Sequence, residues 1–235
     1  MGANAQTSVP AFTAGQVLTA QQQTEINTGI PVFATTTTRD AAFGGTGEKV
    51  LAEGQFAYIE ASNTTQYYDG AAWQTVGGGL TLIKTQTIGS AVSSVAVTDA
   101  FSATYDAYKI VITGGVGSAA STQLNTILTG STTGYYYGLV YNSYNATTTS
   151  LGATNATSWL YTGGVSTNII QYEMDLLNPF LAKYTQMRCY LARTDIQGNN
   201  SGYHAVATSY TGFTIAPDSG TLTGGTIRVY GYQNS

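Results

Sequence analysis

From Leu80 onward the chain is a succession of short runs in which apolar and polar residues alternate. In the run at 169–176, Gln171, Glu173 and Asp175 fall on one face, and the other face is apolar: Ile170, Tyr172, Met174 and Leu176. A period of two predicts a strand with one face buried and one in solvent. Clusters of Gly, Ser and Asn separate the runs, which we place at 81–88, 92–97, 108–113, 123–129, 135–142, 158–162, 168–177, 186–193, 204–210 and 226–232.

About ten short strands at this spacing, with no helical pattern among them, predict an all-β fold. The arrangement most typical of such a pattern is a β-sandwich of the jelly-roll kind. The sequence has no internal repeat of fixed period, which argues against a propeller, a solenoid or a long β-helix. The order of the strands within the sandwich does not follow from the pattern.

The first eighteen residues have no sustained period and contain Pro10, so we expect an extended arm. Its apolar side chains need a surface to lie on, and they are the candidate docking residues: Val9, Phe12, Val17 and Leu18. Thr19 followed by Gln22 resembles a capping box, and Gly29 and Pro31 lie beyond the next periodic stretch. We therefore expect one short helix over 19–27 and no other.

A small antiparallel meander is expected over residues 55–76. Two aromatic-rich runs flank Asp69 and Gly70, and Asp-Gly is a strong hairpin signal. A meander of this size is too small to be stable alone, so it needs a neighbouring domain or chain.

The charge distribution divides the chain at the same region. Residues 1–79 contain six acidic and two basic residues, whereas residues 80–235 contain six of each. Three consecutive glycines at 77–79 form a flexible joint at this division. We expect an anchoring arm with a small β module over 1–79 and a β-sandwich head over 80–235.

Composition excludes several classes of function. Only 9% of the residues are charged, against about 25% in ordinary proteins, and the net charge is −4. With the eight Lys and Arg dispersed, nucleic-acid binding is not expected. No apolar window is long enough to cross a membrane, and the N-terminus lacks the basic and apolar regions of a signal peptide. We expect no membrane insertion.

Candidate chemistry is sparse, and we expect a protein that is not an enzyme and has no cofactor. The single Cys189 cannot form an internal disulfide, and the single His204 cannot supply a histidine-rich metal site. His204 would have to serve any Ser-His or Cys-His catalytic arrangement, but it lies in a strand-like run and fits an ordinary strand histidine. Glu173 and Asp175 could form the carboxylate pair of a glycosidase. Their spacing is also that of any half-solvated strand.

Tyrosine dominates the aromatic residues, with 18 in the chain. Tyrosine rings suit stacking on sugars, yet alternate rings in a strand also fill a core. Two stretches rich in amide and hydroxyl groups, at 142–157 and 195–203, are expected to be loops at the tip of the sandwich. They and their aromatic margins supply the candidate ligand contacts: Tyr144, Asn145, Trp159, Asn199, Asn200 and Tyr203. Without Lys or Arg to bind anions, these residues suit a neutral glycan. The alternative is that both stretches are solvated connections.

Several segments resemble the surface proteins of tailed-bacteriophage virions, of the tail-fibre or head-fibre type. The opening VPAFTAGQVLTA at 9–20 is similar to the start of many such proteins, as are VFAT at 32–35 and RDAA at 39–42. GQFAY at 54–58 with QYYDGAAW at 66–73 is similar to a small β module near their N-termini. GGTIRVYGY at 224–232 resembles the last strand of their β-rich C-terminal domains, together with Phe101 and YDAYKI at 105–110.

The resemblance implies a homotrimer, with residues 1–79 bound to other virion proteins and the C-terminal part exposed, where its ligand would be a neutral host-surface glycan. The lack of a signal-peptide pattern fits a virion protein assembled in the host cytoplasm. We therefore expect a non-enzymatic fibre or adhesin on the virion whose head attaches to the host. The alternative is a capsid or tail decoration protein, of the head-fibre kind, that stabilises the particle and binds no receptor. A surface hydrolase is disfavoured by the few candidate catalytic residues.

Overall fold

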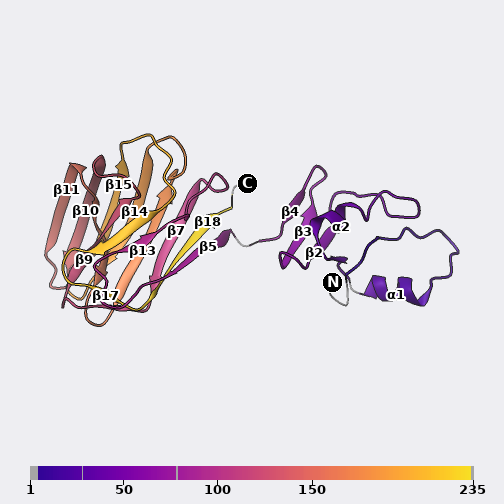
Figure 1. Cartoon of the computed structure of the whole chain (residues 1–235), viewed down its shortest axis with the longest axis horizontal. Coiled ribbons are helices and arrows are strands. Elements are labelled where there is room, and N and C mark those ends of the chain that lie inside the picture. The colour runs from indigo at the N-terminus through magenta and orange to yellow at the C-terminus, as the bar shows by residue number, and fades with distance from the viewer. Residues whose placement is uncertain (1–4, 28, 78, 234–235) are drawn as a thin grey trace. The chain divides into compact units, whose positions relative to one another are not determined.

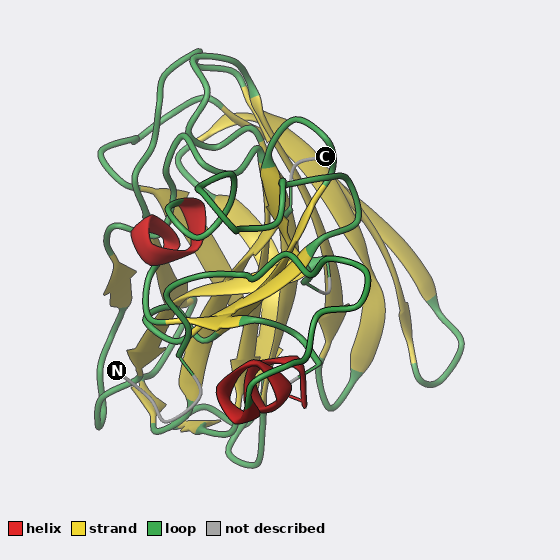
Figure 2. Cartoon of the chain, turned by 90° about the vertical axis from the view of Figure 1, so that its right-hand side faces the viewer, coloured by secondary structure: helices red, strands yellow, loops and turns green. Residues whose placement is uncertain are grey.

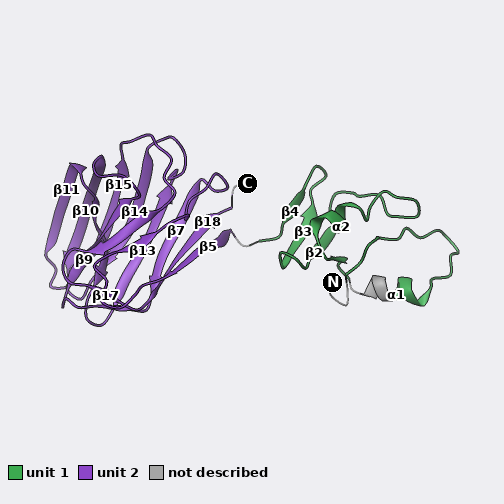
Figure 3. Ribbon diagram, viewed as in Figure 1, with its two compact units in different colours: residues 1–78 green, residues 79–235 purple. Residues whose placement is uncertain are grey.

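The computed structural model describes residues 5–27, 29–77 and 79–233 of the 235-residue chain (Figure 1). The chain divides into two compact units, residues 1–78 and residues 79–235 (Figure 3). The division lies one residue from the boundary expected at the glycine joint.

Unit 1 contains a four-stranded sheet with the order β1-β2-β3-β4. Strand β1 runs parallel to β2, and the other pairs are antiparallel, so the meander predicted over 55–76 is present. Its elements are α1 (Ala20–Asn27), β1 (Val32–Phe33), α2 (Thr36–Asp40), β2 (Phe56–Ile59), β3 (Thr64–Tyr68) and β4 (Trp73–Thr75). The turn before β4 is held by Asp69, whose carboxylate accepts hydrogen bonds from the amides of Ala71 and Ala72.

The helix α1 begins where the capping pattern predicts. The Gln22 amide donates to the Thr19 hydroxyl at 3.2 Å, and the Thr19 amide donates to the Gln22 side chain at 3.0 Å. The expectation of a single helix is wrong, because α2 has a reciprocal cap of its own between Thr35 and Thr38. There the Thr38 hydroxyl accepts the hydrogen bond from the N-cap amide that a Glu or Gln side chain accepts in the usual capping box. The sequence therefore lacks the usual Ser/Thr-x-x-Glu/Gln pattern at the start of α2. Figure 2 shows these two short helices beside extensive strand and loop.

The core of unit 1 is small. Four residues are fully buried and form one cluster: Phe33, Ala42, Ala57 and Ile59. Arg39 is also buried, with its guanidinium 4.5 Å from the centre of the Trp73 ring and hydrogen bonds to Asp40 and Gln66. A cation over an aromatic ring thus extends a core with few apolar side chains.

Unit 2 is a β-sandwich whose strand order is that of a jelly roll. Eight strands form two antiparallel layers, β5-β18-β7-β13 and β6-β16-β9-β12, joined where β12 pairs with the start of β13. Numbered by chain order among these eight, the layers read 1-8-3-6 and 2-7-4-5, the double Greek key of a jelly roll. The strands are β5 (Leu80–Thr87), β6 (Val95–Val97), β7 (Ala107–Thr113), β9 (Thr122–Leu128), β12 (Trp159–Val165), β13 (Ile170–Leu177), β16 (Phe213–Pro217) and β18 (Thr226–Tyr232). The prediction of an all-β, jelly-roll-like sandwich is confirmed.

Two hairpins are inserted into this order and widen the first layer. One is β10 (Tyr135–Ser143) with β11 (Thr148–Ala156), and the other is β14 (Thr185–Ala192) with β15 (Ile196–His204). They add to β13 in the order β13-β14-β15-β10-β11, so that the large sheet runs from β11 at the left of Figure 1 to β5 at the right. A short pair, β8 (Val116–Gly117) with β17 (Leu222–Thr223), lies outside both layers.

The core lies between the layers. The alternation predicted for 169–176 is confirmed, since Ile170, Tyr172, Met174 and Leu176 are buried. They join buried side chains of the opposite layer, including Leu124, Phe213 and Ile215. The inner side of the inserted hairpins has a separate, smaller cluster of Leu139, Leu191 and Ile196.

Three expectations about strands and loops are wrong. The run at 204–210 is not a strand, since only His204 belongs to β15. The expected loop at 142–157 is mainly the edge strand β11, and the expected loop at 195–203 is mainly β15. The inward positions of β15 are Ile196, Gly198, Asn200, Gly202 and His204. Of these only Ile196 has an apolar side chain, so the apolar alternation that marks a strand is missing.

Candidate functional site

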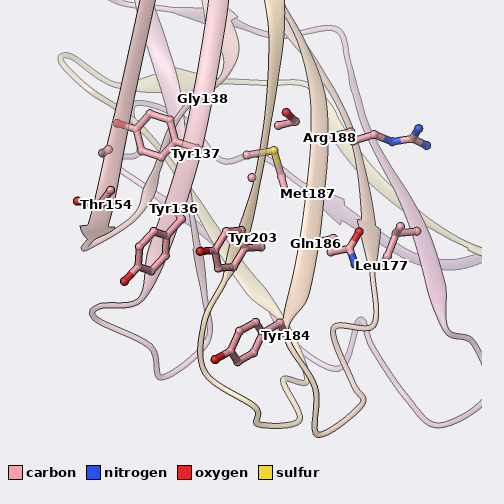
Figure 4. A pocket seen from close by; sticks show the side chains of 13 residues that line it. Tyr136, Tyr137, Gly138, Thr154, Leu177, Tyr184, Gln186, Met187, Arg188 and Tyr203 are labelled. Carbon is pink, nitrogen blue, oxygen red and sulfur yellow. The ribbon is translucent and has the colours of Figure 1, made fainter.

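A groove of about 890 Å³ lies on the outer face of the large sheet, over the inserted hairpins (Figure 4). Strands β10, β11, β13, β14 and β15 all contribute to it. We call it the main groove and define it by these lining residues: Tyr136, Gly138, Tyr184, Gln186, Arg188, Ser201 and Tyr203.

Three tyrosines at one end of the main groove form what we call the tyrosine platform: Tyr136, Tyr184 and Tyr203. The Tyr136 and Tyr203 rings are parallel within 2°, with centres 4.9 Å apart, and the Tyr184 ring is within 9° of Tyr203 at 6.0 Å. Figure 4 shows the three rings offset from one another with their faces turned the same way. Tyr184 is 53% exposed and Tyr203 40% exposed, so a ligand can reach the rings.

The strand register explains why these rings meet. Tyr136 lies opposite Tyr203, and Tyr203 lies opposite Gln186, so the three outward side chains share one row across the sheet. The preceding row, of Tyr135, His204 and Thr185, points inward and is buried. Because side chains alternate along a strand, one residue of the run 135–137 enters the core and the next joins the platform.

Glycine and serine form the floor of the main groove beside the platform. Gly138 lies opposite Ser201, which lies opposite Arg188. A Cβ atom added at Gly138 would meet no other atom within 4 Å, so this position opens into free space. The absence of a side chain there keeps the groove hollow.

The acidic residues near the groove are held in ion pairs. Lys109 donates to Glu173 at 2.5 Å and lies 3.8 Å from Asp175, and Arg188 lies 3.7 Å from the same aspartate. The hydrogen bond to Glu173 raises the pKa of Lys109, so this lysine stays charged. The pair weighed as glycosidase carboxylates therefore shares a cation, and Asp175 also accepts a hydrogen bond from Tyr232.

His204 is fully buried under the platform. Its Nε2 lies 2.7 Å from the Ser131 hydroxyl and 2.9 Å from the Thr133 carbonyl, and its Nδ1 lies 3.3 Å from the Tyr210 hydroxyl. Burial lowers the pKa of His204 and raises that of Cys189 to about 12. Both groups are buried, and these neutral forms fit their surroundings.

The structure separates the six predicted ligand contacts. Tyr144 and Asn145 are exposed at the tip of the β10–β11 hairpin, while Asn199 and Tyr203 lie on the outer face of β15. Trp159 and Asn200 are corrections: Trp159 is fully buried against Tyr135, and the Asn200 amide is used inside, donating to the carbonyls of Leu160 and Tyr161. Neither side chain can meet a ligand.

The four predicted docking residues also separate. Val9 packs on the core of unit 1, and its backbone pairs with Ala42 and Lys49, so it belongs to the module itself. Phe12 and Val17 are exposed, at 42% and 90%, and Leu18 is half-buried. Of the four, Phe12 and Val17 are the side chains free to contact another protein.

The sequence did not predict that Tyr136 and Tyr184 lie beside Tyr203. The run of three tyrosines at 135–137 is visible in the sequence, but which ring points outward depends on the register of β10. Tyr184 precedes β14 in a connection, and nothing in its local sequence relates it to residues 136 and 203.

Within the described ranges, no helix is long and apolar enough to span a bilayer. Nor do three or more His, Cys, Asp and Glu side chains there gather as a set that could hold a metal ion. Comparison with protein-family models, with curated proteins and with solved structures finds no match.

Proposed function

We propose that this chain is a non-enzymatic surface protein of a bacteriophage virion, a fibre or adhesin in which unit 1 docks to the particle and unit 2 contacts the host. The observation that carries the proposal is the tyrosine platform. Three parallel rings on a rigid sheet, two of them exposed and Tyr136 half-buried, give a large contact area at little cost in side-chain entropy. The resemblance of residues 9–20, 54–73 and 224–232 to phage virion proteins supplies the biological setting.

The ion pairs around Lys109 favour binding over catalysis. Glu173 and Asp175 are only two residues apart on one strand face and share a cation, rather than flanking an open cleft from opposite sides. A retaining or inverting glycosidase needs two carboxyl groups on either side of the scissile bond. The groove is therefore better suited to holding a ligand than to cleaving it.

Exposed apolar residues of unit 1 support the docking part of the proposal. Phe12 and Val17 project from the arm, and Phe56, Tyr67 and Val76 are exposed on the small sheet and after it. Association with another protein would remove this apolar surface from water. We propose a homotrimer, with unit 1 seated on other virion proteins.

The exposed apolar residues of unit 1 also fit a second candidate, a decoration protein that stabilises the capsid or tail. In that role a neighbouring virion protein would cover the tyrosine platform. Immunogold labelling of intact particles with antibodies against unit 2 tests both candidates. Labelling at the particle surface, together with adsorption of the purified full chain to host cells, is expected for an adhesin. Labelling without adsorption would favour decoration, and no labelling of particles would contradict both.

A further inference from the structure

Two smaller hollows continue the main groove along the outer face of the sheet. The second, of about 230 Å³, shares Arg188 with the main groove. The third, of about 190 Å³, shares Tyr190 and Asn199 with the second. We call the three together the track.

The track runs parallel to the strands. On β15 its outward positions are Tyr203, Ser201, Asn199 and Gln197, each two residues from the next. Six residues of strand span about 20 Å, which is longer than one sugar ring. A ligand that fills the track is therefore a chain of several units.

Exposed aromatic side chains lie at each end of the track. The tyrosine platform lies at one end, and Tyr190, 39% exposed, lies at the other, where its hydroxyl donates to Gln197 at 2.7 Å. Between them the Gly138–Ser201 floor leaves space for a bulky unit. Ring faces separated by a hollow that is lined with amide and hydroxyl groups match the apolar faces and hydroxyls of sugars.

The charges along the track are balanced. Lys109 and Arg188 face two carboxylates, Glu173 and Asp175, and the exposed Arg188 side chain lies 3.7 Å from Asp175. The residues lining the track therefore give an anionic polymer no net positive charge to bind. Strands β14, β15 and β10 are paired on both sides beneath the track, so a peptide finds no free backbone edge to extend.

From this geometry we propose that the track binds a linear neutral oligosaccharide lying along β14, β15 and β10. The inference rests on the proposed attachment function and names its ligand class. The tyrosine platform holds one part of the chain, and Tyr190 with Asn199 holds a part several sugar units away.

The first test is binding of the full chain to an array of neutral linear oligosaccharides, from monosaccharides to octasaccharides, with matched glycans that carry uronic or sialic acid. Calorimetry on the best neutral series then measures affinity against length. Affinity should rise at least about tenfold from the monosaccharide to the longer chains, as one further contact of ordinary strength gives. Binding limited to acidic glycans, no saccharide binding, or affinity independent of length would overturn the proposal.

Three variants locate the site. Gly138→Val fills the floor from a position that opens into free space, and it should weaken binding of the longer chains at least about tenfold. Tyr190→Ala should weaken the longer chains and leave the monosaccharide unchanged. Thr85→Val, on the same face of the sheet at β5, is the matched control and should change neither.

If Gly138→Val fails to fold, Tyr203→Ala tests the platform in its place. A folded Gly138→Val or Tyr203→Ala protein that binds like wild type contradicts the proposal. Adsorption of the full chain to host cells without binding to any neutral glycan would leave the attachment function standing and remove this inference. If the chain binds neutral glycans but is not found on particles, the glycan site stands and the proposed attachment function is contradicted.

Discussion

The two halves of the large sheet differ in the side chains that they bury. In the jelly-roll half, strands β5, β18, β7 and β13 face a second layer, and their inward positions are apolar. In the inserted half, β14, β15, β10 and β11 bury polar residues such as Asn200, His204 and Thr185. Every hollow described above lies over the inserted half or at its border with β13. The larger apolar core thus lies under the jelly-roll half, and the hollows lie over the insertions.

The largest effect is expected from truncating the core between the jelly-roll half and the second layer that covers it. Phe213 is fully buried and stacks on Phe101 with ring centres 5.7 Å apart. Replacing Phe213 with Ala should lower the free energy of unfolding by about 3–5 kcal/mol, measured by urea denaturation of the full chain. The control Phe213→Leu should cost less than about 1.5 kcal/mol. A small loss in the alanine variant would show that the second layer does not support the sheet.

Acidification should weaken the inserted half through His204. Burial lowers the pKa of His204 in the folded state, so the unfolded chain binds the proton more readily. Stability is then complete above the ordinary pKa of 6.5 and falls as the pH drops towards the folded value. Each unit of pKa difference contributes about 1.4 kcal/mol.

The measurement for His204 is the melting temperature between about pH 7 and pH 5, a window in which unperturbed carboxylates remain largely ionised. The wild type should lose stability across it, and the variant His204→Gln should show a flatter profile. An identical slope in the two proteins would assign the pH dependence to other groups.

Removing a platform ring should cost little stability. Tyr203 is on the solvent face, so Tyr203→Ala loses mainly its parallel contacts with Tyr136 and Tyr184. The expected loss is about 1 kcal/mol in urea denaturation. A loss as large as that of Phe213→Ala would indicate that the platform is a structural cluster rather than a binding surface.

The smallest effect, and one of opposite sign, is expected at Gly138. A β-branched residue fits a strand better than glycine, and a Cβ atom added at Gly138 meets no atom within 4 Å. Gly138→Val should leave stability unchanged or raise it by about 0.5 kcal/mol in thermal denaturation. A clear loss of stability would mean that the groove floor is packed.

The same contrast explains what the sequence could predict. The jelly-roll half follows the rule of alternating apolar residues, as in β13, so its strands and the sandwich class were predictable. In the inserted half, β10 and β14 were also predicted, at 135–142 and 186–193, but β15 buries Asn200 and His204, and β11 is an exposed edge strand. Both β15 and β11 were therefore expected to be loops.

The candidate site was predictable only in part. Tyr203 and Asn199 were expected to bind a ligand, and they lie on the track. Trp159 was expected at the surface because it follows a polar stretch, yet it is packed against Tyr135 in the core. Tyr136 reaches Tyr203 through pairing between two separate insertions, and such pairing has no local signature in the sequence. Tyr184 reaches Tyr203 across the β14–β15 hairpin, whose second strand was expected to be a loop.

The open floor at Gly138 has a consequence for how this surface can evolve. Single-nucleotide changes in a glycine codon give alanine, valine and other small or polar residues. At most buried glycines such changes strain the backbone or collide with neighbours, but at Gly138 the new side chain has free space in front of it. The depth of the groove can therefore change by one mutation in the inserted hairpins while the jelly-roll half of the sheet is untouched. If the groove binds a ligand as proposed, variants with altered recognition are then reachable without an intermediate that fails to fold.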